Sequence, residues 1–124
     1  MDERYWKGIQ QFNEQDFFLA HETLEDLWHE YRGTDRVYLQ ALIQVAAGLY
    51  HLDAGNWKGA RSQISKGLQK LGPYHPSHGR VDVKTLTSQL ETCLRTVERI
   101  EEGRLSTFDT SLFPQITILP EPMN

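Results

Sequence analysis

Residues 37–52 read VYLQALIQVAAGLYHL and contain no charged side chain. This stretch is shorter than the roughly 20 apolar residues that span a bilayer, and it includes two glutamines and a histidine. A helix that is apolar on most of its sides must be covered by other elements of the protein. We therefore predict a central helix over 35–54 that other helices surround, and we expect no membrane insertion.

The predicted central helix has an apolar inner face and a partly polar opposite face. The inner face, at helical spacing, consists of Leu39, Leu42, Ile43, Ala46, Leu49 and Tyr50. The opposite face consists of Gln40, Gln44, Ala47, Gly48 and His51. Polar groups between packed helices need hydrogen-bond partners, so the opposite face is a place to look for a site.

Four further helices carry apolar stripes at spacings of three and four residues. They are predicted over 3–13, 17–32, 57–71 and 83–102. Their ends are predicted from capping residues, which are Asp16, Asn56 and Asp82 at starts and Gly33 and Gly55 after ends. Gly67 lies on the inner face of the fourth helix, where glycine favours close contact with a neighbouring backbone.

The segment GPYHPSHGRVD (72–82) is predicted to be a solvated loop, including its histidines His75 and His78, because proline and glycine interrupt the helical pattern. After Gly103, three prolines exclude a helix, and ITIL (116–119) is predicted to lie against the bundle as an extended arm. We therefore expect an all-α fold, with one helical bundle over 1–103 and an arm over 104–124.

The first and second pairs of helices share a pattern at an offset of forty residues. Gly8, Ala20 and Leu24 in the first pair correspond to Gly48, Ala60 and Ile64 in the second. Each half predicts a helical hairpin with a tight crossing. This spacing resembles the tetratricopeptide helix pair, which implies two stacked hairpins. No peptide-binding function follows, because geometry alone does not carry function.

Charge and cysteine content exclude several classes of protein. The formal net charge of -4 argues against dedicated nucleic-acid binding, and the fourth helix has only a modest basic face. A single cysteine excludes an internal disulfide, and Cys93 is predicted to pack in the core. Residues 1–4 lead into no apolar run, so we expect no secretory signal and a reducing cytoplasm as the compartment.

The second helix carries AHETLEDLW (20–28), which supplies the candidates for chemistry. His21 and Glu25 are one turn apart, so both can reach one point. If the second and third helices are neighbours, these two residues converge with Gln44 and His51. Trp28 lies near His21 on the helical wheel and completes the candidate polar cluster. Supporting positions are Asn13, Glu22, Gln40 and Asn56.

Two interpretations of this cluster remain open. Two imidazoles and a carboxylate can hold a divalent metal, with His21, Glu25 and His51 as ligands, or perform acid–base chemistry. The same residues can instead satisfy one another as a structural network. The zinc motif H-E-x-x-H is absent, because Glu25 stands where that motif needs a second histidine.

The cluster leads to two hypotheses of different class. The first is a binding module whose groove receives a small ligand, a protein partner or the chain's own arm. The second is a metal-dependent or acid–base hydrolase that uses His21, Glu25 and His51. A homodimer is a further expectation, on the assumption that Phe18 and Tyr38 are exposed.

Three blocks in order, FNEQDFF (12–18), AHETLEDLW (20–28) and LQALIQVAAGLYHLDAGNWKGA (39–60), resemble a family of small helical proteins. That family is described as a domain of unknown function, number three hundred and nine. The resemblance covers residues 5–72 and implies an all-helical fold, with no activity attached. It marks Asn13, His21, Glu22, Glu25, Trp28, Gln44, His51, Asn56 and Gly59 as motif positions. Ala41 stands where the family often has glycine.

Overall fold

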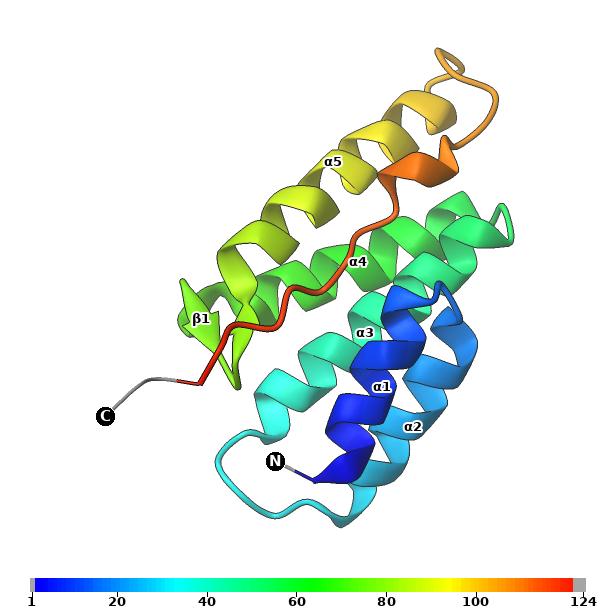
Figure 1. The fold of residues 1–124 in the computed structure, drawn as a ribbon. Coiled ribbons are helices and arrows are strands. Elements are labelled where there is room, and N and C mark those ends of the chain that lie inside the picture. Colours follow the sequence, from blue (N-terminus) through cyan, green and yellow to red (C-terminus); the bar gives the residue numbers. More distant parts are fainter. Residues whose placement is uncertain (1, 122–124) are drawn as a thin grey trace.

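The computed structural model describes residues 2–121 and contains five α-helices in this range (Figure 1). They are α1 (Glu3–Asn13), α2 (Phe17–Glu30), α3 (Arg36–Asp53), α4 (Trp57–Leu71) and α5 (Val83–Glu101). Two short 3-10 turns, Gly72–Tyr74 and Thr110–Leu112, and a hairpin of β1 (Ser77–His78) and β2 (Val81–Asp82) complete the fold. The predicted all-α fold is confirmed. The predicted arm extends into residues 122–124, which lie outside the described range.

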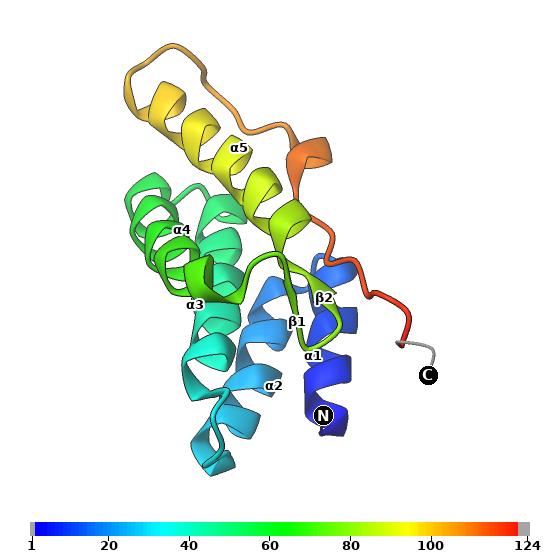
Figure 2. The same cartoon turned by 90° about the vertical axis from the view of Figure 1, so that its left-hand side faces the viewer.

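Consecutive helices pack against one another. α1 packs on α2, α2 on α3, and α3 on α4, so the two predicted hairpins lie side by side (Figure 2). α5 then packs on α4, and the chain after α5 returns across the bundle toward α1 (Figure 1). Because α3 has a helix on two sides and the hairpin at its first turns, it is the most enclosed helix of the fold.

The two helical hairpins cross closely at equivalent glycines. A Cβ added at Gly8 would lie 2.6 Å from Cγ of Leu24, and one added at Gly48 would lie 2.7 Å from Cγ1 of Ile64. Both distances are shorter than any normal carbon–carbon contact. The tight crossing predicted from the repeated pattern is therefore confirmed in both halves.

α3 is the central helix that the uncharged stretch predicted. Its buried residues are Tyr38, Leu39, Ala41, Leu42, Ile43, Val45, Ala46, Gly48, Leu49 and Leu52. Two expectations about its tyrosines are wrong. Tyr50 is 43% exposed, because its ring packs beside Phe18 at the surface instead of entering the core. Tyr38 is fully buried, because the β-hairpin covers it. Within residues 2–121, no helix has both the length and the apolar character needed to cross a membrane.

The β-hairpin closes over a buried pair of tyrosines. The hydroxyl oxygens of Tyr5 and Tyr38 lie 2.7 Å apart, and each is within hydrogen-bond distance of a hairpin carbonyl oxygen. Nε2 of His78 lies 2.8 Å from Oδ1 of Asp35, and the His78 ring packs against Tyr38. The solvated loop predicted for 72–82 is confirmed at His75, which is exposed, and is wrong from His78 onward, because contacts to α1 and α3 hold the hairpin in place.

Local capping explains several helix ends. Asn56 and Asp82 each accept a hydrogen bond at 3.0 Å from the backbone N–H three residues later, and Gly55 has a φ of +77°, as predicted. Two capping predictions are wrong. The exposed side chain of Asp16 makes no capping hydrogen bond, since water is available to its carboxylate. Gly33 is not left-handed, because α2 has already ended before it.

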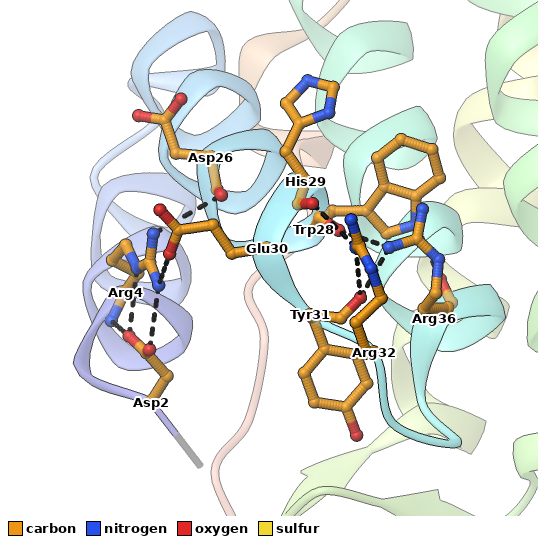
Figure 3. Close-up of polar contacts among 9 residues, drawn as sticks. All are labelled: Asp2, Arg4, Asp26, Trp28, His29, Glu30, Tyr31, Arg32 and Arg36. Atoms are coloured by element: carbon orange, nitrogen blue, oxygen red, sulfur yellow. Dashed lines mark hydrogen bonds and ion pairs between the residues drawn. The ribbon is translucent and has the colours of Figure 1, made fainter.

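α2 ends at Glu30, two residues before its predicted end, because guanidinium groups satisfy its last carbonyl oxygens (Figure 3). Nη1 of Arg36 donates to the carbonyl oxygens of Trp28 and Tyr31, at 2.7 and 2.6 Å. Nη1 of Arg32 donates to the carbonyl oxygens of His29 and Tyr31. With these partners in place, Tyr31 adopts an extended backbone instead of continuing the helix.

The C-terminal arm is held at one residue by a side chain of α1. Nδ2 of Asn13 donates to the carbonyl oxygen of Ile116 at 2.9 Å, and Oδ1 accepts from the N–H of Ile116 at 2.7 Å. Phe113 and Ile116 are buried, and Ile118 forms one isolated bridge with Val81 of β2. The arm is extended as predicted, and the bridge between Ile118 and Val81 is its one β-type pairing among the described residues.

Replacing Asn13 with alanine is expected to detach the arm near Ile116, because both backbone groups of that residue lose their partner. We expect amide hydrogen exchange at Ile116 to become at least about tenfold faster, since each lost bond is worth about 1 kcal/mol. Gln10→Ala, an exposed position on the same helix, is the matched control. An unchanged exchange rate in Asn13→Ala would show that the arm is held by its buried apolar side chains and its hydrogen bonds to the β-hairpin, and not by Asn13.

Cys93 lies in the core, as predicted, with no exposed surface. Its Sγ donates to the carbonyl oxygen of Leu112 at 3.4 Å, and burial raises the pKa of the thiol to about 12. Because the thiolate is the reactive form, we expect a disulfide reagent to modify native Cys93 only at the rate of unfolding. Urea should restore full reactivity, and rapid modification without urea would contradict this burial.

Candidate functional site

The candidate residues of α2 and α3 meet at a small pocket. Its volume is about 190 Å³, and its lining comes from both helices. The lining residues are Phe18, His21, Ala47, Tyr50 and His51. The two helix-borne histidines singled out in the sequence therefore face one cavity, which is the arrangement that the predicted site requires.

His21 is paired with a carboxylate on its own helix. Its Nε2 lies 3.0 Å from Oε2 of Glu25, and the side chain is 28% exposed. The other oxygen of Glu25 lies 3.6 Å from Nε2 of His29, whose side chain is 62% exposed. A neighbouring carboxylate favours a proton on the facing ring nitrogen, so neutral His21 keeps Nδ1 as a hydrogen-bond acceptor.

His51 is positioned by the start of α4. The N–H of Gly59 donates to Oδ1 of Asn56 at 3.0 Å, which fixes the orientation of the Asn56 amide. Nδ2 of Asn56 then lies 3.3 Å from Nδ1 of His51 and can only donate to it. Neutral His51 therefore carries its proton on Nε2. A Cβ at Gly59 would lie 2.7 Å from Nδ2 of Asn56 and 3.0 Å from Cγ of His51.

The remaining cluster residues do not line the pocket. Nε1 of Trp28 donates to the carbonyl oxygen of Arg36 at 3.1 Å, and the guanidinium of Arg36 lies 4.1 Å from the Trp28 ring. Trp28 therefore supports the end of α2. Gln44 lies on the His51 face of α3, with its Oε1 buried and without a hydrogen-bond partner among residues 2–121. Gln40 is half-buried one turn earlier.

The supporting positions have separate roles. Asn13 holds the arm, Asn56 orients His51, and Glu22 is exposed to solvent. As far as Glu121, the last described residue, the arm passes along α1 and β2 and contributes nothing to the lining of the pocket, so the hypothesis that this part of the arm fills the groove is wrong. Hydrogen bonds from Asn13 direct it elsewhere.

The three-ligand metal site predicted from His21, Glu25 and His51 is not assembled. Within residues 2–121, no group of three or more His, Cys, Asp and Glu side chains is placed to hold a metal ion. The physical reason lies at Glu25, which pairs along α2 with His21 and His29 and does not line the pocket that His21 and His51 share.

Sequence reasoning missed the aromatic rim of the pocket. Phe18 is 47% exposed, Tyr50 is 43% exposed, and their ring centroids lie 5.3 Å apart. Phe18 stands one turn before His21, and Tyr50 directly precedes His51. The position of an aromatic residue one turn before His21 is a usable signal for Phe18, whereas the helical wheel assigns Tyr50 to the inner face.

Comparison with known proteins bears on this part of the chain. No curated protein matches the sequence. Residues 5–63 match the model of a family described as "Domain of unknown function (DUF309)". All five residues that line the pocket fall within the matched range. The resemblance predicted from the three sequence blocks is confirmed over residues 5–63, and the chain resembles the DUF309 family there.

Proposed function

We propose that this chain is a binding module for a small ligand that occupies the pocket between α2 and α3. The observation that supports this most strongly is that His21 and His51, from two helices, line one pocket with Phe18 and Tyr50. Exposed aromatic rings and a few placed polar groups are the usual composition of a small-molecule site. Because the rings of Phe18 and Tyr50 are exposed, a ligand can reach the pocket from solvent.

The hydrogen-bonding character of the pocket indicates the class of ligand. Nε2–H of His51 is a donor, because Asn56 occupies Nδ1, and Nδ1 of His21 is an acceptor, because Glu25 faces Nε2. A hydroxyl group can accept from the first and donate to the second. We therefore infer a small, uncharged, apolar ligand that carries one hydroxyl, of which phenol is the simplest probe.

The acid–base hydrolase remains an alternative prediction, since His21 is a base beside an orienting carboxylate. The cytoplasm, the absence of nucleic-acid binding and a homodimer also remain predictions from the sequence. The lone buried cysteine is compatible with a reducing compartment.

Titration with phenol, followed by two-bond ¹H–¹⁵N correlation spectra of the imidazole rings, tests the proposal. These spectra identify the protonated nitrogen of each histidine and report binding in the same experiment. We expect His51 protonated on Nε2 and His21 acting as an acceptor at Nδ1, with both rings shifting saturably as phenol is added.

Gly59→Ala should displace Asn56 and weaken phenol binding by at least about fivefold, which corresponds to one lost hydrogen bond. His29→Gln is the matched control, because it removes an exposed histidine that lies on the same face of α2 as His21. This variant should bind phenol as the parent does. Toluene should bind more weakly than phenol. Equal shifts in toluene and phenol, or none at either ring, would overturn the proposal.

A further inference from the structure

A second and larger cavity lies where α1 begins, α2 ends and the β-hairpin turns. Its volume is about 730 Å³, within the usual range for small-molecule sites. It shares no residue with the pocket between α2 and α3. Its walls include the apolar or aromatic side chains of Trp6, Leu27 and Tyr31. They also include three arginines and two carboxylates, which are Arg4, Arg32, Arg80, Asp2 and Glu30.

The charges at this cavity are unevenly balanced. Arg4 is neutralised by Asp2 and Glu30, at 3.1 and 2.8 Å (Figure 3). Among residues 2–121, Arg32 donates only to carbonyl oxygens and forms no ion pair. Nε of Arg80 donates to the carbonyl oxygen of Leu119 at 3.1 Å, and its Nη1 lies 3.5 Å from Oε1 of Glu121, a carboxylate that is 78% exposed. The lining therefore carries three guanidinium groups against two carboxylates, and both carboxylates pair with Arg4. Arg32 and Arg80 are left without a carboxylate partner inside the cavity, in a protein whose formal net charge is -4.

A hydroxyl donor and an aromatic face stand beside these cations. The hydroxyl of Tyr31 accepts from the N–H of Asp35 at 3.3 Å and donates to no acceptor among the described residues, so its proton is available. The guanidinium of Arg80 lies 5.3 Å from the centre of the Trp6 ring, which holds it over an aromatic surface. The end of α2 does not repel an anion strongly, because Arg36 already satisfies its carbonyl oxygens.

From these observations we propose that this cavity binds an organic anion, in which a phosphate monoester or a free carboxylate is joined to a flat aromatic body. Arg32, Arg80 and the Tyr31 hydroxyl would receive the anionic oxygens, since guanidinium groups match such oxygens in geometry and charge. The aromatic body would pack against Trp6 and Leu27. The proposal is independent of the proposed function, because it uses other residues.

Phenyl phosphate is the probe, and the indole N–H of Trp6 is the reporter. Trp57, whose ring lies away from this cavity, provides an internal control in the same spectrum. We expect a saturable shift at Trp6 with a dissociation constant below about 1 mM, which weakens as salt is raised. Phenol and inorganic phosphate, tested separately, should each shift Trp6 at least about tenfold more weakly, because each lacks one half of the ligand.

Arg32→Gln is expected to weaken phenyl phosphate binding at least about tenfold, since it removes a charged donor that makes no ion pair in the fold. Arg61→Gln changes the net charge equally but lies on α4, paired with Glu101, and should leave binding within twofold. Equal losses in both variants, a shift at Trp6 from phenol as strong as that from phenyl phosphate, or no shift at Trp6 would each overturn the proposal.

Discussion

The free energy of unfolding is expected to fall steeply above pH 10, with a loss of about 5 kcal/mol or more by the time the pH lies between 11 and 12. The reason is that three buried groups ionise in this pH range only in the unfolded chain. Burial raises the pKa of Cys93 to about 12 from an ordinary 9.0, and that of Tyr5 to about 12 from 10.0. It also raises the pKa of Tyr38, whose hydroxyl lies against that of Tyr5.

The sign follows from proton binding. Above the ordinary pKa of each group, the unfolded chain loses a proton that the folded chain keeps, so unfolding is favoured as pH rises. Each such proton lowers the free energy of unfolding by about 1.4 kcal/mol per pH unit. The contribution is fully present below pH 9 for the thiol and below pH 10 for the tyrosines. A loss of 5 kcal/mol approaches the whole stability of many domains.

Urea denaturation between pH 8 and pH 11.5 measures these slopes directly. Of the three groups, only the Cys93 thiol should contribute between pH 9 and 10, so Cys93→Ala should flatten that interval and also reduce the slope between pH 10 and about 12 by about 1.4 kcal/mol per pH unit. Tyr5→Phe should leave that interval unchanged and reduce the slope above pH 10 by about 1.4 kcal/mol per pH unit. Slopes that do not depend on either substitution would show that these groups ionise within the folded protein.

Features set by neighbouring residues could be predicted from the sequence. α4 runs over Trp57–Leu71 as expected, because Asn56 caps its start and the Gly72–Pro73 pair ends it. The pocket between α2 and α3 could also be predicted in part. His21 and His51 were identified from helical wheels and from the assumption that consecutive helices are neighbours, and both line the pocket.

Features set by distant contacts could not be predicted. The end of α2 depends on Arg36, a residue of the next helix, and the β-hairpin has strands of only two residues that carry no periodic pattern. Tyr38 looked exposed because nothing local indicates that the hairpin covers it. The metal hypothesis failed because Glu25 pairs along α2 with His21 and His29 and does not line the pocket that His21 and His51 share.

The crossing of α3 and α4 leads to the second large expected effect. Gly67→Ala is expected to lower the free energy of unfolding by about 1–2 kcal/mol. The added Cβ would lie 2.6 Å from Cγ2 of Val45 and 3.2 Å from the carbonyl oxygen of Ala41. Overpacking of a core costs about 1–3 kcal/mol, whereas alanine gains about 1 kcal/mol of helix propensity over glycine. The cost of overpacking exceeds the gain in helix propensity here, because Val45 is β-branched, fully buried and restricted to one rotamer in a helix.

A double-mutant cycle with Val45→Ala separates crowding from other effects of the substitution. Val45→Ala removes the nearest atom, so the double variant should be more stable than the sum of the two single changes by about 1–2 kcal/mol. Ser65→Ala, an exposed position on α4, should change stability by less than about 0.5 kcal/mol. If Gly67→Ala were instead more stable than the parent, helix propensity would outweigh contact, and the close crossing of α3 and α4 would be wrong.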